Sequence, residues 1–97
     1  MATTTLTMNP QKITVSGTSE HDINFDGLLQ DNLGTAVIDW LSGTSIQVNG
    51  SGRAITSDTG AITSARNKLL IPVQKGVNIR YKGGAGSETF EIVIFSE

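Results

Sequence analysis

Apolar and polar residues alternate in short runs along most of this chain, and turn-forming residues separate the runs. Residues 12–16 read Lys-Ile-Thr-Val-Ser, residues 22–26 read Asp-Ile-Asn-Phe-Asp, and a glycine follows each run. Successive side chains of a β-strand point to opposite faces, so a period of two is typical of a strand with one buried and one solvent-facing side. The pattern recurs often enough to predict eight to ten short strands and no amphipathic helix of useful length.

The same period assigns side chains to the two faces of each predicted strand. The residues expected to point inward are Ile23, Phe25, Ile46, Val48, Ile79, Tyr81, Phe90, Ile92 and Ile94. Residues 28–34 are the least strand-like and are expected to form one helical turn or a packed loop. Pro72 interrupts the apolar run 69–73. Because proline lacks the N–H that a ladder needs, this strand should lie at a sheet edge or carry a bulge.

These strands lack helices that could serve as crossover connections, so they must pair mainly antiparallel. They must also close into a sandwich or a barrel to cover their edges. We therefore expect an all-β fold, an antiparallel β-sandwich, with residues 1–97 as a single domain. The Cys…Trp…Cys spacing of immunoglobulin domains is absent from the sequence, which favours a jelly-roll-like arrangement.

Composition narrows the class of function. Of the 97 residues, 37% are hydrophobic and 16% are charged, and the net charge is −2. Without a basic patch, the chain is not expected to bind nucleic acid. No apolar run has the length of a membrane span, and residues 1–10 lack the basic and apolar regions of a secretory signal peptide. The expectation is a soluble protein without a signal peptide and without a membrane partner.

Three short motifs resemble catalytic or metal-binding signatures, and none is complete. Asp58-Thr59-Gly60 is the triplet of aspartic proteases, but it lies past the middle of the chain and no strongly apolar run precedes it. Residues 22–27 match the first half of a calcium loop, yet Leu33 stands where the bidentate glutamate belongs. His21 is the only histidine, and no nucleophile elbow accompanies it. We therefore predict no enzyme activity, no metal and no other cofactor.

Two turn-rich segments have structural interpretations. Residues 54–57 and 61–64 both read Ala-Ile-Thr-Ser, and they flank residues 58–60 as the two arms of a hairpin would. Residues 83–86 are rich in glycine but open no helix, which disfavours a phosphate-binding loop. A flexible loop before the last strand is expected there.

The last predicted strand is apolar on both faces, with Val93 and Phe95 opposite the inward residues of 90–94. Two apolar faces need two covers, and a neighbouring subunit can supply the second. A chain this short also buries a modest core and has no cysteine to form a disulfide. Val93 and Phe95 are therefore candidate subunit or partner contacts in a homo-oligomer, with a trimer favoured.

Two aromatic residues offer a different possibility. Sugar-binding surfaces use exposed rings that stack on the apolar faces of sugars. Trp40 and Tyr81 are the candidates for a sugar contact, although each shares a strand face with an isoleucine and is expected in the core.

The C-terminal third carries a resemblance to a known class of domain. Residues 70–81 read Leu-Ile-Pro-Val-Gln-Lys-Gly-Val-Asn-Ile-Arg-Tyr, a glycine-rich loop follows, and residues 90–95 read Phe-Glu-Ile-Val-Ile-Phe. This order resembles the closing strands of small jelly-roll domains in bacteriophage virion accessory proteins, such as decoration proteins, head fibres and tail-fibre tips. Residues 40–46 resemble the strand that precedes them in such domains.

The resemblance implies a structural protein located on the virion, without an active site. We expect a capsid decoration or head-attached protein that forms oligomers and contacts a larger protein assembly such as a capsid. The alternative is a monomeric carbohydrate- or receptor-binding β-sandwich module, in which Trp40 or Tyr81 would be exposed.

Overall fold

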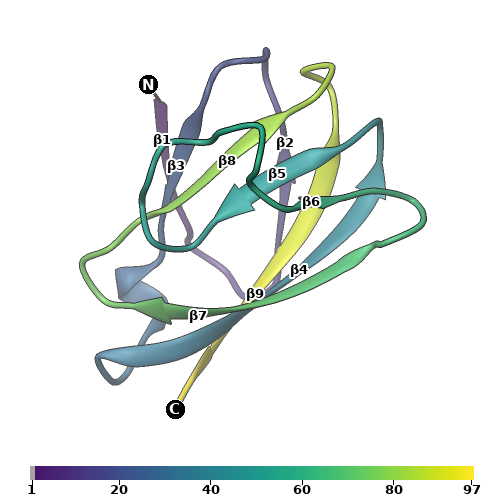
Figure 1. The fold of residues 1–97 in the computed structure, drawn as a ribbon. Helices are drawn as coiled ribbons and strands as arrows, with labels where there is room; N and C mark the ends of the chain where they lie inside the picture. Colours follow the sequence, from purple (N-terminus) through teal and green to yellow (C-terminus); the bar gives the residue numbers. More distant parts are fainter. Residues whose placement is uncertain (1) are drawn as a thin grey trace.

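The computed structural model describes residues 2–97, which form nine β-strands and one short 3-10 helix. They are β1 (Ala2–Thr5), β2 (Gln11–Thr14), β3 (His21–Asn24), η1 (Asp26–Leu28), β4 (Leu33–Ser42), β5 (Ile46–Asn49), β6 (Ala61–Ile62), β7 (Lys68–Gln74), β8 (Ile79–Gly83) and β9 (Thr89–Ser96). The strands lie in two layers that pack face to face (Figure 1). The predicted β-sandwich is confirmed, and the number of strands lies within the predicted range.

The order of the strands identifies the topology. One sheet has the order β1-β3-β8-β5-β6 and the other the order β2-β9-β4-β7. Except for the parallel pair β1–β3, the paired strands of residues 2–97 run antiparallel. When β2 is counted as strand 1 and β9 as strand 8, one sheet contains strands 1, 8, 3 and 6 in that order. The other sheet contains strands 2, 7, 4 and 5 in that order. This is the order of an eight-stranded jelly roll, to which β1 adds an edge strand.

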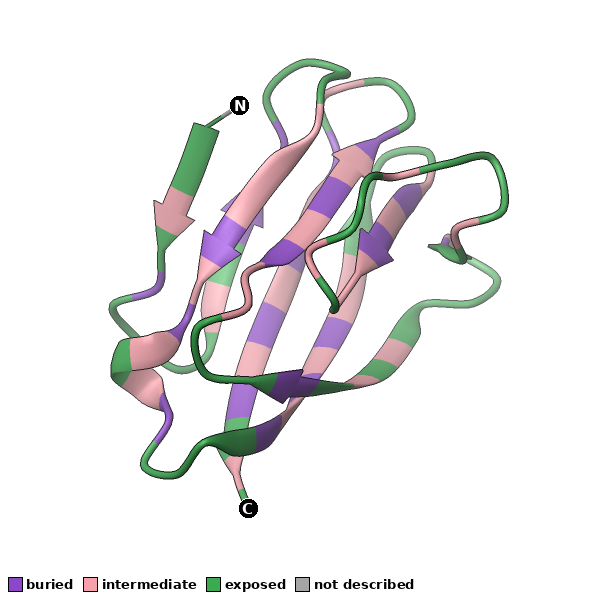
Figure 2. Ribbon diagram, turned by 60° about the vertical axis from the view of Figure 1, so that its left-hand side comes forward, coloured by how far each residue is buried: buried purple, intermediate pink, exposed green. Residues whose placement is uncertain are grey.

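The core lies between the two sheets, and every residue predicted to point inward is buried there. The core also contains Leu6, Ile13, Val15, Leu29, Ala36, Ile38, Ile62 and Val73. Figure 2 shows the period of two directly, because buried and more exposed bands alternate along β4 and β9. Hydrophobic alternation therefore determines which face of each strand lies in the core.

Three local expectations have different outcomes. A single helical turn forms, but η1 covers Asp26–Leu28, slightly earlier than expected. Pro72 lies in β7, which is an edge strand paired with β4 alone, so the edge prediction is confirmed. The hairpin of residues 54–57 and 61–64 is wrong, because Ala61 and Ile62 pair with β5 instead. That pairing buries the Ile62 side chain in the core, which a surface hairpin would not do.

Candidate interaction surface

The outer side of the sheet β1-β3-β8-β5-β6 is covered by the protein itself. The β5–β6 loop, residues 50–60, swings across this sheet (Figure 1). The Gln47 side-chain amide donates to the carbonyl oxygens of Thr56 at 2.9 Å and Thr59 at 3.2 Å. The N–H of Ile55 donates to Oε1 of Glu20 at 2.6 Å. These bonds hold the loop on the sheet, so this side offers little free sheet surface.

The outer side of the sheet β2-β9-β4-β7, called the outer face below, is open and partly apolar. Strand register places Leu70, Val37 and Val93 side by side across β7, β4 and β9. Phe95 lies in the next row of β9, beyond Val93, and Leu33 lies at the start of β4. Leu70 is 66% exposed, Phe95 is 55% exposed and Leu33 is 50% exposed.

The size of this apolar area decides whether it needs an explanation. A large apolar side chain has roughly 150 to 200 Å² of surface, so the three exposed residues alone leave on the order of 300 Å² open to solvent. The largest apolar patch on a typical monomeric protein has roughly 300 to 600 Å² and is often a contact site. The outer face is therefore the candidate interaction surface of this chain.

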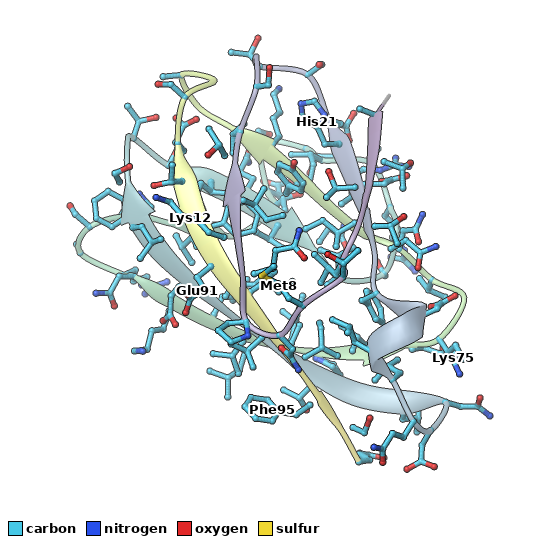
Figure 3. The ribbon with its side chains drawn as sticks, turned by 180° about the vertical axis from the view of Figure 1, so that it is seen from behind. Met8, Lys12, His21, Lys75, Glu91 and Phe95 are labelled. Carbon is cyan, nitrogen blue, oxygen red and sulfur yellow. The ribbon has the colours of Figure 1, made fainter. Side chains whose placement is uncertain are left out.

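A row of charges borders the apolar rows. Lys12, Glu91, Asp39 and Lys68 are neighbours across β2, β9, β4 and β7. Lys68 Nζ lies 2.9 Å from Asp39 Oδ1, and Glu91 has no ion-pair partner within 4.0 Å among residues 2–97. Figure 3 shows Lys12 and Glu91 beside each other, with Phe95 farther along β9. Two like charges, Asp39 and Glu91, thus occupy the middle of the row.

The predicted contact residues lie on this outer face. Phe90, Ile92 and Ile94 are buried, whereas Val93 is half-buried and Phe95 projects outward. The opposite orientation of the two sets is as expected, and the contact of Val93 and Phe95 with another subunit stays a prediction.

The two aromatic candidates for a sugar contact lie on the inner side of the sandwich. Tyr81 is 3% exposed, its ring stacks on His21 with centroids 5.4 Å apart, and it makes a T-shaped contact with Phe90 with centroids 5.2 Å apart. Burial also raises the pKa of its hydroxyl. Tyr81 has no free ring face for a sugar, which corrects that assignment. Trp40 is half-buried against the core, and its Nε1 donates to the carbonyl of Thr44 at 3.1 Å.

The calcium-like residues make separate structural hydrogen bonds. Asp22 accepts from Arg80 at 3.0 Å, Asn24 accepts from the N–H of Asp26, and Asp26 accepts from the N–H of Gly76. Their side-chain oxygens thus cap or join segments of the fold. No group of three histidine, cysteine or acidic residues in the range 2–97 lies close enough to hold a metal ion.

The protease-like triplet and the histidine have similar local roles. Asp58 is exposed at the tip of the β5–β6 loop, and its N–H donates to the hydroxyl of Thr56. His21 Nε2 lies 2.9 Å from the carbonyl oxygen of Ser16. That contact holds the start of β3 against the preceding loop.

Glu88 is a buried charged residue that the sequence analysis missed. It is 0% exposed and lies at one end of the sandwich, directly before β9. Its Oε2 accepts from the hydroxyl of Thr44 and from the N–H of Ala85 at 2.7 Å, and its Oε1 accepts from the N–H groups of Gly86 at 2.9 Å and Ser87 at 3.1 Å. The sequence contains an indication of this burial, because Glu88 continues the every-second-residue pattern of the inward residues Phe90, Ile92 and Ile94.

The hydrogen bonds around Glu88 affect its pKa and the conformation of the loop that precedes β9. Burial acts to raise the pKa of Glu88, but the hydrogen bonds from Thr44, Ala85 and Gly86 together outweigh it and lower the pKa from 4.5 to about 2. Residues 83–86 are therefore a loop wrapped around an ionised carboxylate. The expectation of a flexible loop is wrong, since backbone N–H groups bind the carboxylate from within the same turn.

A groove lies beside the edge strand β7, where the two sheets separate. It has a volume of about 530 Å³. The residues that line it are Leu33, Asn49, Gly50, Ser51, Ile71, Pro72, Val73, Gln74 and Val77. Leu33 and Pro72 connect this mostly apolar groove to the outer face.

Comparison with known protein families, with curated protein sequences and with solved structures finds no match for this chain. Within residues 2–97, no helix is long and apolar enough to cross a membrane. The geometry described above is thus the basis for proposing a function.

Proposed function

We propose that this chain is a non-enzymatic structural protein that works as a homo-oligomer, with a trimer favoured, on a larger protein assembly. The assembly is a bacteriophage capsid, on which the chain is a decoration or head-attached protein. The observation that carries the proposal is the contrast between the two sides of the sandwich. One side is covered by residues 50–60, and the other presents uncovered apolar rows.

The oligomer follows from the cost of leaving apolar surface in water. Transfer of apolar surface out of water contributes roughly 25 cal/mol per Å², so about 300 Å² is worth about 7 kcal/mol before the entropy of association is subtracted. Phe95 and Val93 supply contacts on a fixed β-strand, because β4 pairs with β9 at both residues, and β2 pairs with the first half of β9. A second copy of the chain is always present at the same concentration and can provide the cover.

The capsid part of the proposal has different support. It rests on the resemblance of residues 70–81 and 90–95 to the closing strands of jelly-roll domains in phage accessory proteins. The jelly-roll strand order agrees with that expectation. Location on the virion follows from the same resemblance.

The oligomer is tested by light scattering of the purified protein at micromolar concentration. A mass several times 10.2 kDa is expected for the wild type. Phe95→Asp should give a folded monomer, because this side chain points away from the core. Leu41→Asp, an exposed leucine beyond the charged row, is the matched control and should keep the wild-type mass. A monomeric wild type would refute the oligomer.

The location is tested on the native source. Purified virions should contain this chain in a fixed ratio to the major capsid protein, and electron microscopy should locate it on the particle surface. Its absence from washed particles would refute the capsid assignment and leave the oligomer unaffected.

A further inference from the structure

The charges of the outer face oppose packing of this face on itself. If two copies packed outer face against outer face about a two-fold axis parallel to the strands, β9 of one copy would lie over β4 of the second copy. Glu91 would then meet the second copy's Asp39, and Lys12 would meet its Lys68. If the two-fold axis were instead perpendicular to the strands and passed between the rows of Val93 and Phe95, Glu91 would lie over the second copy's Glu97. Like charges opposed within a contact are unfavourable.

The groove beside β7 has properties that complement the outer face. Its walls include the apolar side chains of Ile71, Val73 and Val77. Lys75 follows directly after Gln74, which lines the groove, and Lys75 has no ion-pair partner within 4.0 Å among residues 2–97. The groove is thus an apolar hollow, and the residue that follows its lining residue Gln74 carries a positive charge.

The outer face offers the matching features. Phe95 projects from β9, and Glu91 is an unpaired negative charge four residues away on the same strand face. Figure 3 shows Glu91 and Phe95 on one side of the molecule and Lys75 on the other, so Glu91 and Lys75 cannot pair within one chain. Glu91 lies beside Lys12 without forming an ion pair with it, and Lys75 forms no ion pair among residues 2–97, so both charges are available for a contact between copies.

We infer that the outer face of one copy binds the β7 groove of the next copy, with Phe95 toward the groove and Glu91 toward Lys75. This inference rests on the proposed homo-oligomer and specifies how its subunits meet. The contact joins two different surfaces that border each other at Leu33 and Pro72, so each copy uses the Val93 and Phe95 rows of its face toward one neighbour and its groove toward the other. Such contacts form a closed ring when the rotation between neighbours closes, and three copies form the smallest ring of this kind.

The available area supports the use of both surfaces. Four strands spaced about 4.8 Å apart, with about 3.3 Å per residue, give the outer face a flat area of roughly 500 Å². A stable contact buries roughly 800 Å² on each partner. A flat contact over this face falls short of this value, whereas a groove that encloses the sides of the projecting Phe95 ring buries more area on each partner.

Engineered cysteines test the geometry, because the chain has no cysteine of its own. Val93→Cys on the outer face and Gln74→Cys at the groove are purified separately, refolded together and treated with a short bis-maleimide. Cross-links between the two variants are expected, with little cross-linking of either variant alone. Thr18→Cys, on an exposed loop, is the control and should cross-link with neither. Efficient cross-linking of Val93→Cys to itself would overturn the inference.

Charge exchange provides the second test. Glu91→Lys and Lys75→Glu should each raise the concentration at which the oligomer dissociates about tenfold, and the double variant should return it toward the wild-type value. Lys82→Glu, on the other sheet, should have no effect. A stable dimer by light scattering, or a double variant weaker than both single variants, would overturn the face-to-groove contact. A monomeric wild type would instead overturn the proposed function.

Discussion

Replacement of Glu88 by glutamine should destabilise the fold in a pH-dependent way. The glutamine side chain of the Glu88→Gln variant keeps nearly the same shape but replaces one carboxylate oxygen by an amino group. The four donors that surround Glu88 belong to Thr44, Ala85, Gly86 and Ser87. A neutral amide has one oxygen to accept from them, and its own N–H groups point at other N–H groups. Buried donors therefore lose their acceptor, and the fold loses the stabilisation of the ionised form.

The magnitude follows from the pKa of Glu88. A pKa of about 2 in the folded protein, against 4.5 in the unfolded chain, corresponds to about 3 kcal/mol at 1.36 kcal/mol per pKa unit. Because the folded pKa is lowered, this stabilisation is complete above about pH 5 and is lost as the pH falls toward 2. At pH 3 the wild type should already have lost about 2 kcal/mol of it.

The assay is urea unfolding at fixed protein concentration, followed by tryptophan fluorescence at pH 7 and pH 3. The variant should be less stable than the wild type by about 3 kcal/mol at pH 7 and by about 1 kcal/mol at pH 3. Glu97→Gln, at an exposed glutamate directly after β9, is the matched control and should change stability by less than about 0.5 kcal/mol. An equal loss at both pH values would mean that shape, and not charge, accounts for the effect.

Three further outcomes are expected. Gly43→Ala should lower the free energy of unfolding in urea by about 2 kcal/mol, because Gly43 has a φ of +99° and a Cβ would lie 2.6 Å from Glu88 Cγ. Gly27→Ala is the control and should lower it little, because open space surrounds Gly27. Asn9→Ala should cost about 2 kcal/mol, since the Asn9 side chain both donates to and accepts from the backbone of Ile94, and the exposed Asn32 is the control for the same substitution. Simple sugars should leave the fluorescence of the half-buried Trp40 unchanged, and a saturable quench would favour the carbohydrate-binding alternative over the structural role.

The sequence predicts the buried faces well because alternation is a local signal. Phe90, Ile92 and Ile94 follow each other at the period of a strand, and the same parity places Val93 and Phe95 outside. Pro72 likewise indicates an edge from a property of one residue. Predictions of this kind need no knowledge of which strands are neighbours.

The candidate surface can be predicted only when the neighbouring strands are known, and no local pattern in the sequence shows which strands pair. Val37 becomes a neighbour of Leu70 and Val93 only through the pairing of β4 with β7 and β9. The failed hairpin has the same cause, since the preceding strand β5 pairs with Ala61 and Ile62 and thereby buries Ile62 in the core. Glu88 was missed because a carboxylate can occupy an inward position only when donors surround it, and neither the turn of residues 85–87 around it nor the tertiary contact with Thr44 can be recognised from alternation.

The edges of this sandwich affect what happens when many copies are crowded together. Exposed strand edges recruit strands from other molecules and can start aggregation. Within residues 2–97, the edge strands β1 and β2 have four residues each and β6 has two, so they offer short templates. The longest edge strand is β7, with seven residues, and it contains Pro72, which has no N–H to donate. Dense packing of copies should therefore leave them as separate folded units, and Pro72→Thr should make concentrated solutions prone to fibre formation.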